Sequence, residues 1–136
     1  MMSWSTTVLS PLELAFIGDA VWEVYVRNHV LELGIRKPAV LHRRATAYVS
    51  ATAQAHLVQA LWEGLTVEEQ DMVRKGRNAK SGHVRKNADV LDYRHSTGFE
   101  ALIGYLYGTE NKERLQVLCQ RALAVIDQKW EDEHGH

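Results

Sequence analysis

Two carboxylic acids lie in stretches of the sequence that are otherwise apolar, and each has a glycine nearby. Asp19 follows Gly18 within LELAFIGDAVWEVYVR (residues 12–27), and Glu100 precedes Gly104 within STGFEALIGYLYG (residues 96–108). An ionised carboxylate in an apolar interior is costly unless a cation compensates its charge. Carboxylate oxygens are ligands that Mg²⁺ prefers, with water or phosphate in the remaining positions. The two acids are therefore candidate ligands of one divalent cation, if the fold brings their segments together.

Each acid also has an interpretation in which it serves only the fold. Asp19 could form a salt bridge with a distant basic residue, and composition alone does not decide between this role and metal binding. Glu23 is better explained by an ion pair with Arg27, four residues later on the same helix. Glu100 has the spacing from Thr97 of a helix-capping box. By spacing alone, the pair of Asp19 and Glu100 is a weak signal.

Composition places the chain among ordinary single-domain globular proteins. Its 136 residues are 46% hydrophobic and 24% charged, which suits one domain, residues 1–136, with one core at about 10–130. One cysteine, Cys119, excludes an intramolecular disulfide and a four-cysteine zinc site. The N-terminus does not resemble a secretion signal, and no run of eighteen apolar residues predicts a membrane span. We therefore expect a cytoplasmic protein without a membrane partner.

The periodicity predicts helices throughout and no strand, so the expected fold class is all-α. Ser10, Pro11 and Glu13 form a start signal for a first helix that ends at Gly34. The further expected elements are a helix from Pro38 to near Gly64, a short helix from Thr66 to Gly76, a basic loop at 77–95, a helix from Ser96 or Thr97 to Gly108, a last helix at about 111–130, and a frayed tail at 131–136.

The first helix is apolar nearly all round, which is typical of a central helix or of a subunit contact. We expect Trp22, Tyr25 and Val26 to pack inside. Asp19, Glu23 and Arg27 follow at spacings of four and form one polar line along this helix.

Charge is distributed unevenly along the chain. Residues 74–95 contain seven Lys or Arg residues against two acids, a net charge of +5, whereas the remainder carries −6 and the whole chain −1. A local basic segment on an acidic body can hold a polyanion without making the whole surface adhesive. The alternative is a solvated charged loop without a ligand.

Four motifs carry a family resemblance. FIGDAV (residues 16–21) resembles the signature helix of the ribonuclease III family, and FEALIGYLY (residues 99–107) resembles that family's second signature. LHRRATAYVSATAQA (residues 41–55) and GRNAKSG (residues 76–82) lie between them in the expected order. The short length and the lack of a double-stranded-RNA-binding domain point to the Mini-III branch of the family.

The resemblance implies an all-α endonuclease domain, a helical bundle that forms a symmetric homodimer and cuts double-stranded RNA with Mg²⁺ or, as a substitute, Mn²⁺. It implies 5′-phosphate and 3′-hydroxyl ends and a role in maturation of large-subunit (23S) ribosomal RNA. The implied substrate is precursor ribosomal RNA, with a ribosomal protein as a candidate accessory partner and no DNA. Asp19 matches the signature aspartate, and Glu100 matches the glutamate of the second motif. The resemblance therefore implies that each of these two residues is catalytic and binds the metal.

Other acids of the full-length enzymes are absent here. Ala15 and Thr97 stand where those enzymes have a glutamate and an aspartate, and Arg36-Lys37-Pro38 replaces another acidic stretch. Mini-III enzymes share this reduced set. The sequence therefore does not decide whether one or two metal ions bind, or whether Glu23 assists in binding them. The alternative function is a catalytically inactive RNA-binding or ribosome-associated protein on the same fold; a third is a helical interaction module whose acids only cap and pair.

A duplex also needs phosphate contacts, because double-stranded RNA is read mainly through its backbone and 2′-hydroxyls. The basic segment is the expected source of these contacts. The candidate RNA-binding residues are Arg77, Lys80, Arg85 and Lys86, followed by Arg74, His83 and Arg94.

Overall fold

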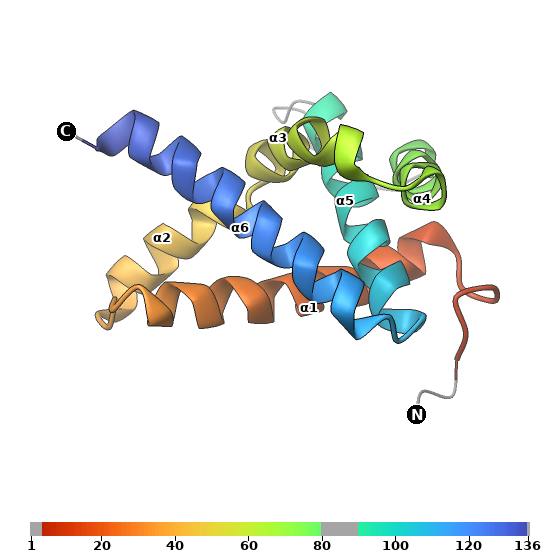
Figure 1. Ribbon diagram of the computed structural model, residues 1–136, viewed down its shortest axis with the longest axis horizontal. Helices are drawn as coiled ribbons and strands as arrows, with labels where there is room; N and C mark the ends of the chain where they lie inside the picture. Colours follow the sequence, from red (N-terminus) through yellow and green to blue (C-terminus); the bar gives the residue numbers. More distant parts are fainter. Residues whose placement is uncertain (1–3, 80–89, 136) are drawn as a thin grey trace.

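A computed structural model describes residues 4–79 and 90–135 (Figure 1). Within these ranges every regular element is helical and no strand occurs, which confirms the all-α prediction. The elements are α1 (Pro11–Glu32), α2 (Pro38–Val49), α3 (Ala51–Leu61), the 3₁₀ turn η1 (Trp62–Gly64), α4 (Val67–Asn78), α5 (Val90–Gly108) and α6 (Lys112–His134).

The predicted start of α1 is confirmed by its cap. The Ser10 side chain accepts a hydrogen bond from the backbone N–H of Glu13, and the Glu13 carboxylate accepts one from the N–H of Ser10. After α1, Gly34 has a φ of 91°, a left-handed conformation that glycine adopts without steric cost. The chain can therefore turn back sharply toward α2.

The prediction of one long helix from Pro38 to Gly64 is wrong. Ser50 is extended, with φ −63° and ψ 155°, and separates α2 from α3. Its side-chain oxygen accepts a hydrogen bond of 3.1 Å from the N–H of Ala53 and so caps the start of α3. The periodic apolar pattern continues across this break, which is why the pattern alone did not reveal it.

The predicted boundaries of the last two helices also need correction. α5 begins by Val90, so residues 90–95 are helical and Thr97 lies inside the helix, where its hydroxyl donates to the carbonyl of Tyr93 at 3.1 Å. The proposed capping box between Thr97 and Glu100 is therefore wrong. α6 extends to His134, so residues 131–134 continue this helix instead of forming a separate tail.

The core forms where α5 passes between α1, α3 and α4 (Figure 1). Trp22 of α1 is fully buried, stacks edge-to-face on Phe99 of α5 at 5.1 Å, and donates its indole N–H to the carbonyl of Tyr48 at 3.1 Å. Val26 is buried as predicted, whereas Tyr25 is only partly buried. The helix that carries Asp19 is thus fixed against the helix that carries Glu100.

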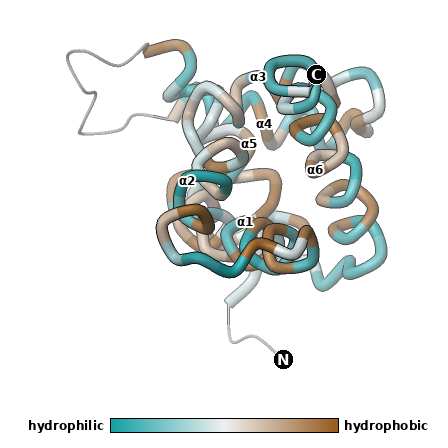
Figure 2. Tube along the Cα trace, turned by 90° about the vertical axis from the view of Figure 1, so that its left-hand side faces the viewer, coloured by the Kyte–Doolittle hydropathy of each residue, from teal (hydrophilic) through white to brown (hydrophobic). Residues whose placement is uncertain are grey.

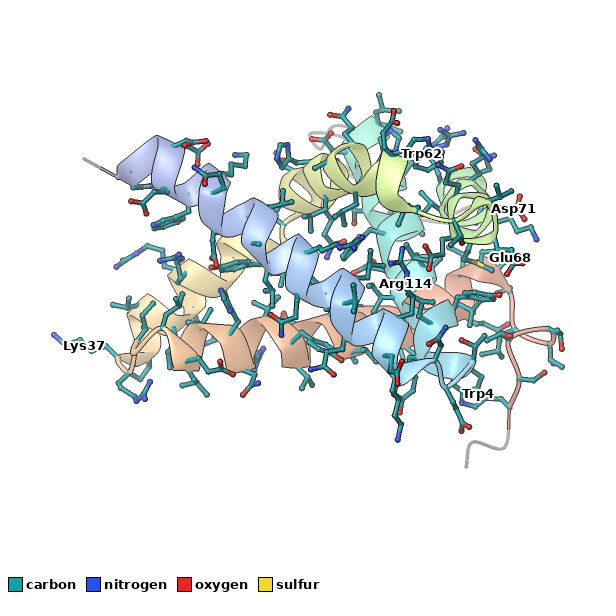
Figure 3. The ribbon with its side chains drawn as sticks, in the orientation of Figure 1. Trp4, Lys37, Trp62, Glu68, Asp71 and Arg114 are labelled. Atoms are coloured by element: carbon teal, nitrogen blue, oxygen red, sulfur yellow. The ribbon has the colours of Figure 1, made fainter. Side chains whose placement is uncertain are left out.

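α6 crosses the bundle and is held by polar contacts near its start and in its second half. Along α6, hydrophilic and hydrophobic residues follow one another turn by turn (Figure 2), as expected for a helix with one buried face. Near its start, Arg114 points toward the beginning of α4 (Figure 3), where it makes two hydrogen bonds, 2.7 and 2.8 Å long, to the Glu69 carboxylate. Further along, Asp127 accepts hydrogen bonds from the Tyr48 hydroxyl and from His29. No helix in the described ranges is long and apolar enough to cross a membrane.

Candidate active site

α1 and α5 cross with their backbones in direct contact at two glycines. A Cβ atom at Gly18 would overlap the carbonyl oxygen of Glu100 and would lie 2.8 Å from the backbone nitrogen of Gly104. A Cβ atom at Gly104 would overlap the carbonyl oxygen of Leu14. Only glycine permits this approach. The crossing places the residue after Gly18, which is Asp19, next to the turn of α5 that carries Glu100.

The side chains of Asp19 and Glu100 meet at this crossing and share a hydrogen bond. Burial, the hydrogen bond to Asp19 and the negative charge of Asp19 together raise the pKa of Glu100 to about 9. Without a cation, Glu100 therefore keeps its proton at neutral pH, and its O–H group donates a hydrogen bond to the Asp19 carboxylate. The sequence prediction that the two acids converge is supported by this contact.

A third side chain reaches the pair from α3. Gln54 is fully buried and hydrogen-bonds to the Glu100 carboxyl group, which opposes the rise in the pKa of that group. Sequence analysis did not select Gln54. The signal was available, because Gln54 is a polar interruption in the buried face of α3 between Ala53 and Leu57.

No third carboxylate joins the Asp19–Glu100 pair from the positions that the sequence analysis considered. Glu23 pairs with Arg27 at 3.1 Å, as predicted, and lies in the groove between α1 and α2. Ala15 and Thr97 occupy the positions at which the resemblance would have placed acids, and the Thr97 hydroxyl is bonded to a backbone carbonyl. In residues 4–79 and 90–135, no group of three or more His, Cys, Asp or Glu side chains could hold a metal ion.

A second glycine contact brings the basic end of α4 close to the site. A Cβ atom at Gly98 would lie 2.7 Å from the carbonyl oxygen of Val73 and 3.5 Å from the backbone nitrogen of Arg77. Gly98 precedes Glu100 by two residues, so the backbone of α4 at Arg77 packs against the turn of α5 that carries the acid.

The other predicted RNA-binding residues fall into two groups. Arg74 is exposed, and its guanidinium lies 5.0 Å from the ring of Trp62, the residue labelled in Figure 3 at the end of α3. Arg94 is exposed on the first half of α5. Lys80, His83, Arg85 and Lys86 lie outside the described residues.

Comparison with known proteins decides the family. Residues 12–111 match the ribonuclease III domain. The chain belongs to the ribonuclease III family. Mini-ribonuclease 3 of Enterococcus faecalis is 56% identical over 120 residues, covering 87% of this chain and 91% of the relative. The Mini-ribonuclease 3 proteins of Brevibacillus brevis and Streptococcus pneumoniae are each 50% identical, covering 87% and 88% of this chain and 88% and 95% of the relatives.

A solved structure supports the fold assignment. The crystal structure of protein FN1578 from Fusobacterium nucleatum superposes with a TM-score of 0.75 at 28% identity, over 86% of this chain and 93% of that one. As a ribonuclease III family member of the Mini-III type, the protein is an endoribonuclease, and the Asp19–Glu100 pair is the candidate centre of its chemistry.

Proposed function

We propose that the protein hydrolyses phosphodiester bonds of double-stranded RNA with Mg²⁺, leaving 5′-phosphate and 3′-hydroxyl ends, in the cytoplasmic maturation of 23S ribosomal RNA. The observation that carries this proposal is the contact between Asp19 and Glu100 at the crossing of α1 and α5. Asp19 is exposed, whereas the side chain of Glu100 is largely buried against it, and both this burial and the negative charge of Asp19 disfavour the ionised form of Glu100. A divalent cation would reverse this effect.

The residues at the crossing fit a Mg²⁺ ion. Two carboxylates supply hard oxygen ligands. The side chain of Gln54, which hydrogen-bonds to Glu100, also has a buried Oε1 atom without a hydrogen-bond partner among the described residues. When bound, Mg²⁺ would lower the pKa of a water molecule and draw charge from the phosphate. Asp19 and Glu100 would hold the ion, and Glu100 would release its proton to do so. Mn²⁺ would suit the same oxygen ligands.

The duplex would be held by the basic segment at residues 74–95. Arg74 and Arg77 on α4 and Arg94 on α5 supply positive charge on two helices that pack together at Gly98. Lys80, His83, Arg85 and Lys86 belong to the same stretch of the chain. Contacts with phosphates fix the position of a duplex without reading its sequence. The Arg side chains would thus orient a strand so that one phosphate lies at the Asp19–Glu100 pair.

Cutting both strands requires two such sites, which a symmetric homodimer provides. The exposed apolar face of α1 is the candidate contact: Phe16 is 83% exposed and Val24 is 68% exposed. Val24 also lines an open groove, together with apolar residues of α1, α5 and α6 and with the polar residues Glu110, Lys112 and Gln116. Phe16 of one copy would fill this groove on the other, which would bury both apolar surfaces.

A cleavage assay tests the proposal. A long RNA duplex is incubated with Mg²⁺ and the parent protein, Asp19→Asn or Glu100→Gln. We expect the parent alone to cut, while both variants bind the duplex with near-normal affinity, because the substitutions remove metal ligands and leave the basic segment intact. Equal cutting by all three proteins would exclude these ligands. Binding without cutting by the parent in any metal would instead favour a catalytically inactive RNA-binding protein, an alternative motivated by Ala15 and Thr97.

A further inference from the structure

Gln54 is a polar side chain within the buried face of α3. It is 1% exposed, and its neighbours on that face are Ala53, Leu57 and Val58. Its side chain reaches Glu100 on α5, so it joins a third helix to the crossing of α1 and α5. Core positions are usually apolar and glutamine is usually exposed, so a fully buried glutamine among apolar neighbours calls for an explanation.

The hydrogen bonds of Gln54 are incomplete within the described part of the chain. Its amide nitrogen contacts the Glu100 carboxyl group and donates a long bond of 3.4 Å to the carbonyl of Val49. Its Oε1 atom is buried, and none of the described residues donates to it. A buried acceptor that has lost water and gained no bond weakens the folded state. A methionine has similar length and would fill the same space without that cost. Stability alone therefore does not account for glutamine here.

We propose that Gln54 is a positioning residue of the metal site: its amide group orients the Glu100 carboxyl group toward Asp19. This inference rests on the proposed function, because it assumes that Asp19 and Glu100 bind a divalent cation. Asp19 is already placed by the Gly18 crossing, whereas the longer side chain of Glu100 has more torsions to fix. Groups that hydrogen-bond to metal ligands set the orientation of those ligands and thereby metal affinity.

The test measures metal binding directly. Mn²⁺ is titrated into the full-length protein without RNA, and free Mn²⁺ is followed by electron paramagnetic resonance. We expect Gln54→Met to raise the Kd for Mn²⁺ by about tenfold or more, while its unfolding midpoint in chelator equals or exceeds that of the parent. Gln70→Met is the matched control, because the Gln70 amide donates at 2.9 Å to the carbonyl of Trp62, away from the acids. Its Kd for Mn²⁺ should match that of the parent.

A second variant keeps the inference open to test if Gln54→Met folds poorly. Gln54→Asn retains the amide but is one methylene shorter, so it should no longer reach Glu100 and should weaken Mn²⁺ binding similarly. A Kd within twofold of the parent for either folded variant would overturn the inference, as would a lower unfolding midpoint with unchanged Mn²⁺ binding. A parent protein that binds no Mn²⁺ would overturn the proposed function itself, and the role of Gln54 with it.

Discussion

The backbone carbonyl oxygen of Glu100 occupies the space that a Cβ atom on Gly18 would need. Because no side chain separates α1 from α5 at this point, the acid that follows Gly18 is held beside Glu100 by the main chain. Gly104 lies against the carbonyl of Leu14 and extends the same contact. The geometry of the candidate site is therefore a property of helix packing as much as of the two acids.

The first prediction concerns this contact. Gly18→Ala should lower the free energy of unfolding by about 3 kcal/mol, because the added methyl overlaps backbone atoms that cannot move aside without separating the helices. RNA cleavage should fall further than stability predicts, since Asp19 and Glu100 would separate. Urea denaturation and a cleavage assay on the folded fraction check both effects. Gly64→Ala is the control, because its nearest neighbour is the flexible end of Arg121 at 3.6 Å. Equal effects of the two substitutions would contradict the argument.

Local signals in the sequence predicted part of this arrangement. The start of α1 follows from Ser10, Pro11 and Glu13, which act within one helical turn. Asp19 and Glu100 stood out because an acid in an apolar run needs compensation. Both the helix start and the unusual acids can be predicted because each depends on residues close by in the sequence.

Other features depended on contacts that the sequence does not encode locally. The spacing of Thr97 and Glu100 fits a capping box and a helix interior equally well, and the helical turns before it decide between the two. Ser50 can interrupt a helix or be tolerated within it, and its role as a cap depends on how α3 packs. Gln54 gains its meaning only from the packing of α3, which brings its side chain to Glu100.

The second prediction is a pH dependence of stability. The pKa of Glu100 rises from 4.5 to about 9 on folding without metal, first through burial and then through Asp19. Between these values the folded protein binds more protons than the unfolded chain, so the free energy of unfolding falls as pH rises. The contribution of Glu100 to this fall is at most about 1.4 kcal/mol per pH unit, and Glu100→Gln removes it.

Chemical denaturation in chelator from pH 5 to 9 provides the measurement. The stability of Glu100→Gln should gain on that of the parent as pH increases, since glutamine does not ionise. Adding Mg²⁺ should stabilise the parent more at pH 9 than at pH 6, because binding the cation no longer has to displace as much proton. Parallel stability curves for the two proteins would show that Glu100 is ionised at neutral pH and would contradict the assignment.

The third prediction concerns the basic end of α4. Arg77→Ala should weaken duplex RNA binding at every sequence, because Arg77 is a cationic residue on the last turn of α4, whose backbone packs against α5 at Gly98, two residues before Glu100. The slope of log K against log salt should become shallower by about 0.7–0.9, the value for one phosphate neutralised by one cationic side chain. Binding isotherms at several salt concentrations give both numbers. Lys129→Ala is the control, since Lys129 on α6 pairs with Glu133 at 2.8 Å. An unchanged salt slope for Arg77→Ala would remove this residue from the interface.

The fourth prediction concerns the apolar face of α1. Phe16 is 83% exposed on α1, the helix whose neighbouring residues Ile17 and Val21 line a groove with α5 and the polar start of α6. A ring so exposed gains stability only if a second surface covers it. Phe16→Glu should therefore convert a homodimer into a monomer, because the glutamate would have to lose its hydration at the contact. Sedimentation equilibrium measures the change, and circular dichroism should show an unaltered helical fold.

A matched control separates this contact from a general effect of exposed apolar residues. Val67 at the start of α4 is 79% exposed, so Val67→Glu introduces the same charge at another exposed position and should leave the dimer intact. The monomeric Phe16→Glu variant should also no longer cut both strands of a duplex in one binding event, since each protomer contributes only one site. A parent protein that is monomeric at micromolar concentration would exclude the proposed dimer. A Phe16→Glu variant that remains dimeric would show that the subunit contact lies elsewhere.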